Sequence, residues 1–235
     1  MKNIIIASTS TIHGSDYLEY MLDELSTFFK DAKTILFIPY ARPSGISHNE
    51  YTKKAATAFA EIDKKVVGIH TFKNPIEAIK NAEAIFTGGG NTFVLVNQLY
   101  KNNLITTLKE TVTNGTPYLG TSAGSNICGL TIKTSNDMPI VYPPSFNTLG
   151  FVPFNINPHY LDPNTNSKHM GETRETRIKE FHSYNTPPVI GLREGSWLRV
   201  NGDSILLKGK LKARVFEYNK TPYEVESGFQ LNHLK

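Results

Sequence analysis

The sequence predicts an α/β fold, in which a mostly parallel sheet carries helices on both faces and an antiparallel hairpin follows near the C-terminus. Short apolar segments alternate with segments of about ten residues in which apolar side chains recur at helical spacing. Such alternation is typical of parallel strands joined by helical crossovers. A chain of 235 residues, 39% of them hydrophobic and 20% charged, also fits a single domain over residues 1–235.

The first half of the chain carries short apolar segments that we predict to be strands, at residues 3–7, 34–38, 66–69, 84–87 and 117–119. The first helix is predicted to start at Asp16 as its N-cap, and the Glu19 side chain, three residues later, is expected to bond back to the N–H of that cap. Asn74 and Pro75 supply a cap and a first-turn proline for another helix. Further helical patterns cover residues 50–60, 93–99 and 104–114.

The second half is less regular. A strand signal over residues 147–157 leads into Pro158 and His159, and a charged helix is predicted over 173–184. Residues 189–192 resemble another buried strand. Residues 197–200 and 204–207 flank Asn201-Gly202, which predicts a type I′ hairpin, and residues 213–216 are expected to extend that antiparallel edge.

Composition excludes several classes of protein. The formal net charge is +4, and the basic residues are scattered, so no nucleic-acid partner is expected. No apolar run approaches the ~20 residues that span a bilayer, and the apolar start turns polar at Ser8, too early for a signal-peptide core. We therefore expect a cytoplasmic protein. The single cysteine, Cys128, excludes an intrachain disulfide and is expected to be a buried, inert thiol.

Two glycine-rich turns follow predicted strands, where ligands of α/β sheets collect. Residues 120–124 match G-x-S-x-G, a sharp strand-to-helix turn that exposes a serine, so Ser122 is a candidate nucleophile rather than an ordinary turn serine. The N–H of Ala123, at the start of the next helix, could stabilise an oxyanion. Residues 88–91 could also form a phosphate cradle or a catalytic turn, but they lack the features of a P-loop or a dinucleotide fingerprint. The alternative is that these glycines only allow a tight turn with positive φ.

A nucleophilic serine needs a base, and the base needs an acid to orient it. Among the histidines, His159 stands out because it follows a strand and a rigid proline. No histidine pair has zinc-site spacing, so no metal is expected. Two acids could serve: Asp137 lies in a loop between nucleophile and base, and Glu194 directly follows a predicted strand. The residues alone do not choose between them.

In these and neighbouring segments, the chain resembles a known family, the α-aspartyl dipeptidases or peptidase E. The resemblance covers most of the chain, in the family's order, and implies a fold similar to the flavodoxin-like sandwich of glutamine amidotransferases. The matching segments are residues 87–93, 120–124, 136–140, 156–159, 171–178 and 190–195.

The resemblance implies a serine peptidase without metal or cofactor, with Ser122 as nucleophile and His159 as general base. The family's third member matches either Asp137 or Glu194; we favour Glu194, because nucleophile, histidine and glutamate in that order also describe the amidotransferase-like relatives. Asp137 would then shape the pocket or bind the substrate amine. Gly90 is implied as the second oxyanion donor, beside Ala123.

The substrate implied is a small peptide with N-terminal aspartate, Asp-X. A guanidinium binds a short carboxylate through two parallel hydrogen bonds and stays charged. We expect Arg174 to do this, with Arg177 second and Asn91 as a further substrate-binding residue. The alternative is that the arginines lie on a solvated helix face, paired with Glu175 or Glu180.

Two rival functions remain at this stage. One is another serine hydrolase of the same fold, such as a cyanophycinase-like enzyme that cleaves aspartyl linkages in an Asp–Arg polymer. The other is a non-enzymatic binding module that keeps the serine turn. We expect a monomer or a homodimer.

Overall fold

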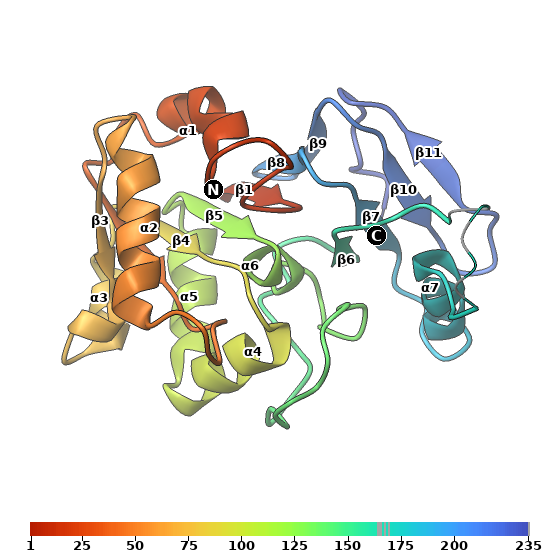
Figure 1. Cartoon of the computed structure of the whole chain (residues 1–235), viewed down its shortest axis with the longest axis horizontal. Coiled ribbons are helices and arrows are strands. Elements are labelled where there is room, and N and C mark those ends of the chain that lie inside the picture. The colour runs from red at the N-terminus through yellow and green to blue at the C-terminus, as the bar shows by residue number, and fades with distance from the viewer. Residues whose placement is uncertain (164–165, 167, 169, 235) are drawn as a thin grey trace.

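A computed structural model describes residues 1–163, 166, 168 and 170–234. Within these residues the strands form two sheets (Figure 1). The strands of the larger sheet are β1 (Asn3–Ala7), β2 (Thr34–Ile38), β3 (Lys65–Gly68), β4 (Ala84–Thr87), β5 (Tyr118–Thr121), β8 (Ser196–Asn201) and β9 (Ser204–Gly209). Those of the smaller sheet are β6 (Asn155–Pro158), β7 (Val189–Leu192), β10 (Ala213–Phe216) and β11 (Tyr223–Val225).

The larger sheet has the order β3-β2-β4-β5-β1-β8-β9. Its first five strands pair in parallel, and β8 then pairs antiparallel with β1 and with β9. The parallel strands are joined by helical crossovers, as the alternating pattern predicts. The predicted α/β class, with a mostly parallel sheet and a hairpin near the C-terminus, is confirmed.

The hairpin itself differs from the prediction in its turn. Asn201 pairs with Ser204, so the two-residue loop is Gly202-Asp203, and of these two only Gly202 has a positive φ, 58°. This conformation matches a type II′ turn with glycine first, rather than the predicted type I′ turn centred on Asn201. Glycine lies in the turn as predicted, but Gly202 is the first of the two central residues rather than the second.

The smaller sheet has the order β11-β10-β7-β6, with β6 and β7 parallel and the others antiparallel. The prediction that residues 213–216 extend the hairpin edge is wrong. Ala213 pairs with Leu192 of β7 instead. Because β-strand pairing depends on which apolar edge is free in three dimensions, sequence adjacency to the hairpin did not decide the partner.

The helices of the described residues are α1 (Leu22–Phe28), α2 (His48–Ala60), α3 (Pro75–Lys80), α4 (Thr92–Lys101), α5 (Leu104–Thr113), α6 (Ala123–Asn126) and α7 (Arg174–His182). Asn74 caps α3 as predicted. The first helix starts later than predicted, with a 3₁₀ turn over Glu19–Met21 after Leu18 at φ 63°. The N–H of Asp16 donates to the Glu19 carboxylate at 2.6 Å. Of the two bonds of the predicted capping box, this is the one that is present.

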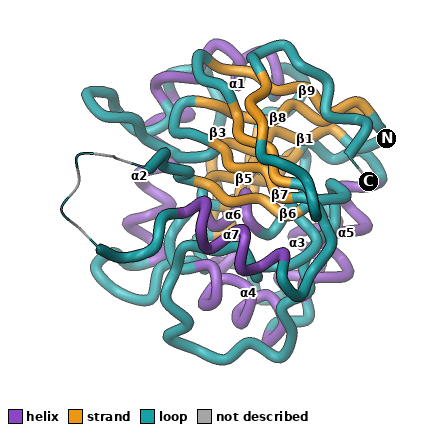
Figure 2. The backbone as a smooth tube through the Cα atoms, turned by 90° about the vertical axis from the view of Figure 1, so that its right-hand side faces the viewer, coloured by secondary structure: helices purple, strands orange, loops and turns teal. Residues whose placement is uncertain are grey.

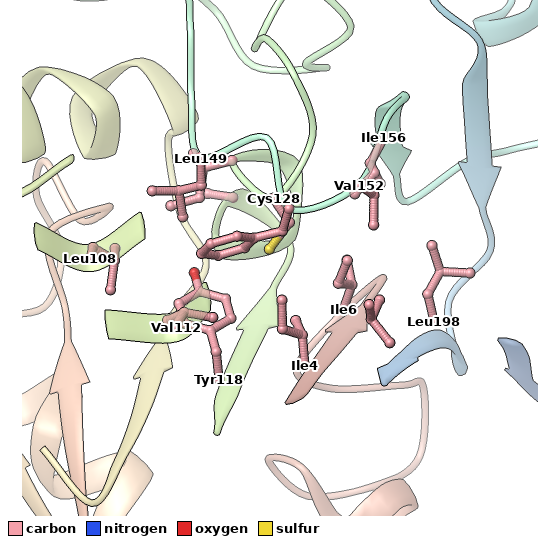
Figure 3. Close-up of a cluster of buried hydrophobic side chains, with 14 of the residues drawn as sticks. Ile4, Ile6, Leu108, Val112, Tyr118, Cys128, Leu149, Val152, Ile156 and Leu198 are labelled. Carbon is pink, nitrogen blue, oxygen red and sulfur yellow. The ribbon is translucent and has the colours of Figure 1, made fainter. Parts of the chain in front are cut away.

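Alternating side chains of the larger sheet enter two hydrophobic cores. Ile5 and Ala7 of β1 face the core under α1 and α2, whereas Ile4 and Ile6 face the core that α4 and α5 cover and that continues beneath the smaller sheet. Figure 3 shows Cys128 and its neighbours in this second core. Cys128 is fully buried, and burial raises the pKa of its thiol, as expected for an inert cysteine.

Helix α7 covers the outer face of the smaller sheet, where Ile178 packs in one cluster with Val189 and Phe216. Figure 1 shows α7, β10 and β11 at the end of the molecule opposite α2 and α3, and Figure 2 shows α7 in front when the molecule is viewed from that end. None of the helices in the described residues has the length and hydropathy needed to cross a membrane.

Candidate active site

The candidate catalytic residues follow the carboxyl ends of parallel strands. Ser122 comes directly after β5, His159 directly after β6, and Glu194 two residues after β7. Because β6 and β7 pair in parallel with Pro158 opposite Leu192, the last two residues emerge at the same edge. This is the edge at which α/β sheets bind ligands.

Ser122 lies in the sharp turn that its flanking glycines predict. Its backbone has φ 54° and ψ −111°, a conformation that side chains other than hydrogen rarely allow. A Cβ on Gly120 would lie 2.3 Å from the carbonyl oxygen of Gly124, and one on Gly124 would lie 2.2 Å from that of Thr87. Both glycines are therefore required, and the strained turn presents the hydroxyl group beyond the strand end.

The three side chains form a continuous hydrogen-bonded chain. The Nε2 atom of His159 lies 2.9 Å from Oγ of Ser122, and its Nδ1 atom lies 2.6 Å from Oε1 of Glu194. The side chains of His159 and Glu194 are 35% and 47% exposed, so the base is open to a small substrate. A nucleophile, a base and an orienting acid in this geometry are the constellation of covalent acyl transfer.

Ser8, at the carboxyl end of β1, is a site residue that sequence reasoning missed. Its Oγ accepts a hydrogen bond from the N–H of His159 at 2.9 Å and donates one to the carbonyl of Leu192 at 2.7 Å. It thereby joins the strand end that carries His159 to the neighbouring strand and to the larger sheet. The same strand-end rule that singles out Ser122 would have indicated Ser8.

The glycine turn after β4 packs against the serine. A Cβ on Gly89 would lie 2.9 Å from Cβ of Ser122, so the backbone of this turn lies beside the candidate nucleophile. Within the described residues, the N–H groups of Gly90 and Ala123 have no hydrogen-bond acceptor. Free backbone donors beside a serine can receive the negative charge that forms on an attacked carbonyl oxygen.

Asp137 does not contact the imidazole. Its Oδ2 accepts hydrogen bonds from the N–H and Oγ1 of Thr92, at 2.7 and 2.5 Å, and from Oγ of Ser135 at 3.2 Å. The carboxylate therefore lies at the N-terminus of α4, where it complements the helix dipole. Of the two acids that the sequence offers as partner of the base, Glu194 is the one hydrogen-bonded to His159.

The remaining predicted site residues lie at two helix N-termini. Arg174 begins α7 and is half-buried; burial lowers the pKa of its guanidinium, as does the charge of Arg177, whereas Asp137 raises it. Neither arginine forms an ion pair within the described part of the chain, and Glu175 pairs with other cations. The alternative of helix-face pairing with Glu175 is therefore not what the structure shows.

Asn91 has both polar side-chain atoms in use. Its Oδ1 accepts from the N–H of Val94 at 3.1 Å, which caps α4, and its Nδ2 donates to the carbonyl of Met138 at 2.9 Å. The amide thus ties the glycine turn to the loop that carries Asp137. Among the other histidines, His70 hydrogen-bonds to Asn49, and His169 lies outside the described residues.

Comparison with known proteins shows the family to which the chain is similar. The profile of peptidase family S51 matches residues 4–208. The peptidase E of Streptomyces coelicolor is 46% identical over 232 residues, 99% of this chain and 94% of that protein. A Drosophila melanogaster protein named "Probable alpha-aspartyl dipeptidase" is 46% identical over 219 residues, 92% of this chain and 90% of that protein.

The fold is shared with a solved structure of low sequence identity. The crystal structure of a peptidase from an acI-B1 Actinobacterium has a TM-score of 0.73 at 17% identity, covering 98% of this chain and 96% of that one. The profile match and the similarity to the relatives above each extend over most of the sequence. The chain therefore belongs to peptidase family S51.

Proposed function

We propose that the chain is a serine dipeptidase that hydrolyses dipeptides with N-terminal aspartate through an acyl-enzyme on Ser122. The observation that carries the proposal is the hydrogen-bonded chain from Ser122 through His159 to Glu194 in a member of a peptidase family. The names of the relatives, peptidase E and alpha-aspartyl dipeptidase, support the substrate class. The proposal includes action in the cytoplasm, as a monomer or homodimer, with no metal or cofactor.

In the first step, Oγ of Ser122 attacks the peptide carbonyl while Nε2 of His159, 2.9 Å away, takes its proton. The carboxylate of Glu194 holds the imidazole through Nδ1 and stabilises the positive charge that forms on it. The N–H groups of Gly90 and Ala123 receive the developing oxyanion, and each such donor is worth about 3–4 kcal/mol of barrier.

The tetrahedral intermediate then collapses. The C–N bond breaks, the leaving amine takes the proton from His159, and the aspartyl group stays on Ser122 as an ester. A water molecule, deprotonated by the same imidazole, attacks the ester and releases aspartate. Apart from the substrate and this water molecule, these steps use side chains and backbone amides of this chain.

Selectivity for aspartate is assigned in this proposal to Arg174. A half-buried guanidinium that forms no ion pair in the described residues favours an incoming anion. Arg177 adds positive charge on the same helix. Asn91, whose side chain is already hydrogen-bonded, would contribute to the wall of the pocket.

The function is tested by offering the protein Asp-Leu, Glu-Leu, Asn-Leu, Asp-Leu-Gly and β-Asp-Arg. We expect hydrolysis of Asp-Leu and none by Ser122→Ala. Cleavage of β-Asp-Arg in preference to Asp-Leu would favour the cyanophycinase-like alternative. No hydrolysis of any peptide by the unaltered protein, together with no labelling of Ser122 by a fluorophosphonate, would reject the enzyme altogether.

The role of Arg174 gives a separate prediction. Arg174→Ala should raise the KM for Asp-Leu by about 10- to 150-fold, because a charge-assisted bidentate contact of about 1.5–3 kcal/mol is lost. Arg177→Ala, on the same helix but exposed, serves as the comparison and should change KM less. Steady-state kinetics of both variants decide; an unchanged KM in Arg174→Ala would remove that residue from the substrate pocket.

A further inference from the structure

The peptide unit between Gly89 and Gly90 has a hydrogen bond at its carbonyl end. The hydroxyl group of Tyr51 donates to the carbonyl oxygen of Gly89, with 3.2 Å between the oxygens. The carbonyl of Gly89 and the N–H of Gly90 belong to the same planar unit. A bond that fixes one end of this plane therefore also fixes the direction of the N–H at the other end, and it polarises the peptide so that this N–H becomes a stronger donor.

Tyr51 is itself held firmly. It lies in α2 with 1% of its surface exposed. The ring of Phe37 meets its ring edge-on at 4.9 Å, and the guanidinium of Arg42 lies 4.9 Å from its centroid. The hydroxyl of Tyr17 donates to the hydroxyl of Tyr51 at 3.4 Å. Because these contacts restrict the ring, its hydroxyl group stays in a fixed position relative to the glycine turn.

The first glycine of the turn is what allows this hydroxyl to reach its acceptor. A Cβ on Gly88 would lie 2.5 Å from Oη of Tyr51 and 2.9 Å from Cζ of Phe37. Any other residue at this position would displace the tyrosine from the carbonyl of Gly89. The need for glycine here is thus explained by the approach of Tyr51, since the chain does not have a positive φ at this residue.

Among the described residues, backbone hydrogen bonds hold the turn only at its two ends. The N–H of Gly88 donates to the carbonyl of Ile38 at 3.2 Å, and the N–H of Asn91 donates to that of Ala41 at 2.7 Å. Between these anchors, Tyr51 is the side chain that binds the middle peptide. In the described residues, the N–H of Gly90 is left without an acceptor, in a turn whose preceding residue, Gly89, packs against Ser122.

We propose that Tyr51 is a positioning residue for the reaction: it orients the Gly89–Gly90 peptide so that the N–H of Gly90 points at the oxyanion formed on attack by Ser122. This rests on the proposed function, in which Gly90 donates to the oxyanion. Tyr51 acts through the peptide and does not touch the substrate. Its contribution therefore belongs to the transition state, where the negative charge is present, rather than to substrate binding.

The principal test is Tyr51→Phe, which keeps the ring and removes the hydroxyl. We expect kcat for Asp-Leu to fall by about 5- to 30-fold with KM within a factor of two, less than the ~10²–10³-fold loss seen when an oxyanion donor is removed outright. Replacing Tyr51 with 4-aminophenylalanine, which retains a donor on the same ring, should restore much of kcat. That variant also tests the role if the phenylalanine variant fails to fold.

A matched control is available in Tyr100. It is half-buried, and its hydroxyl also donates to a backbone carbonyl, that of Asn147, at 3.0 Å. Asn147 belongs neither to the serine turn nor to the glycine turn. Tyr100→Phe should therefore remove a similar hydrogen bond without a comparable loss of kcat.

A second readout separates transition-state from ground-state effects. The aminoboronic acid analogue of aspartate forms a tetrahedral adduct on serine, and Tyr51→Phe should weaken its inhibition by the same factor as kcat. In a Ser122→Ala background, the Kd for Asp-Leu should not change on adding Tyr51→Phe.

The outcomes are distinguishable. Absence of activity in the unaltered protein would reject the proposed function. Full kcat in Tyr51→Phe, an equal fall in Tyr100→Phe, or a loss confined to KM, each with an active unaltered protein, would overturn the role of Tyr51 alone.

Discussion

At the scale of single residues, the backbone of Ser122 is strained. Its φ of 54° with ψ of −111° lies where glycine is tolerated and side chains are strained. The turn is held in place because Gly120 and Gly124 let the backbone pack closely on both sides. The strain is stored where the hydroxyl group is needed.

This strain can be measured directly. Ser122→Gly should be more stable than Ser122→Ala by about 1 kcal/mol, because glycine relieves the conformation and alanine does not. Both variants lack the hydroxyl, so activity does not complicate the comparison. Equilibrium denaturation in urea gives the difference; an alanine variant as stable as the glycine variant would mean that the turn is not strained.

The two acids also separate at this scale. Glu194→Gln should lower kcat by about 10²–10⁴-fold, since the carboxylate that orients and stabilises the imidazolium is lost. Asp137→Asn, which weakens the bonds to Thr92 at the start of α4, should cost about 1 kcal/mol of stability and much less kcat. Kinetics and thermal melting of both variants test this, and a larger kcat loss in Asp137→Asn would reverse the assignment.

At the scale of elements, Arg193 connects the strand end that carries Glu194 to its surroundings. Its guanidinium makes two hydrogen bonds to Asp162, at 2.7 and 2.9 Å, and two to Glu224 of β11, at 2.8 and 2.9 Å. Asp162 lies three residues after His159 in the chain. The ion pair therefore links the two loops that carry the histidine and the glutamate.

These pairs predict a pH dependence. Hydrogen bonding to Arg193 lowers the pKa of Asp162 below its usual 3.8; burial alone would raise the pKa of Glu224, but Arg193 and Arg214 together lower it below 4.5. Carboxylates with a lowered pKa stabilise the folded state above their unfolded pKa, and this stabilisation is lost as pH falls through the folded pKa.

Arg193→Met should therefore be less stable than the unaltered protein at pH 7, with a difference that shrinks as the pH falls below the usual carboxyl pKa values of 4.5 and 3.8. Lys80→Met removes an exposed pair with Glu77 and should change stability little at any pH. Denaturation curves at pH 7, 5 and 3.5 provide the measurement. A difference that stays constant over this range would show that Arg193 acts through packing rather than through its ion pairs.

At the scale of the whole molecule, the site spans the junction of two sheets. Ser122 and the glycine turn extend from the larger sheet, whereas His159 and Glu194 extend from the smaller one. Ser8 bridges them, since it follows β1 of the larger sheet and bonds to His159 and Leu192 of the smaller. Alignment of nucleophile and base therefore depends on how the sheets are held together.

Ser8→Ala should lower stability by about 1–3 kcal/mol, because the partly buried N–H of His159 loses its partner. It should also reduce kcat by about tenfold or more, since the base is no longer held against the larger sheet. Thr148→Val, which removes a buried hydroxyl bond to Gly129 away from the site, is the control and should affect stability only. Retention of full kcat in Ser8→Ala would show that the two sheets align without this bridge.

Local patterns predicted most of the elements and the order of the site residues. Residues 3–7, 34–38 and 84–87 are strands at the predicted bounds, because short buried runs between turn residues leave few alternatives. The first helix starts later than predicted because Leu18 adopts a left-handed conformation that no capping pattern shows. The pairing of residues 213–216 with β7 depended on contacts distant in sequence.

By itself, the sequence determined the α/β class, the strained serine turn and the residue types that acyl transfer needs, since these follow from local periodicity, glycine spacing and side-chain chemistry. Only the tertiary structure decided that Glu194 rather than Asp137 hydrogen-bonds to the imidazole, and that Ser8 and Tyr51 hold the reacting groups. The physical reason is that hydrogen bonds act over about 3 Å, whereas the residues they join here lie up to 184 positions apart in the chain.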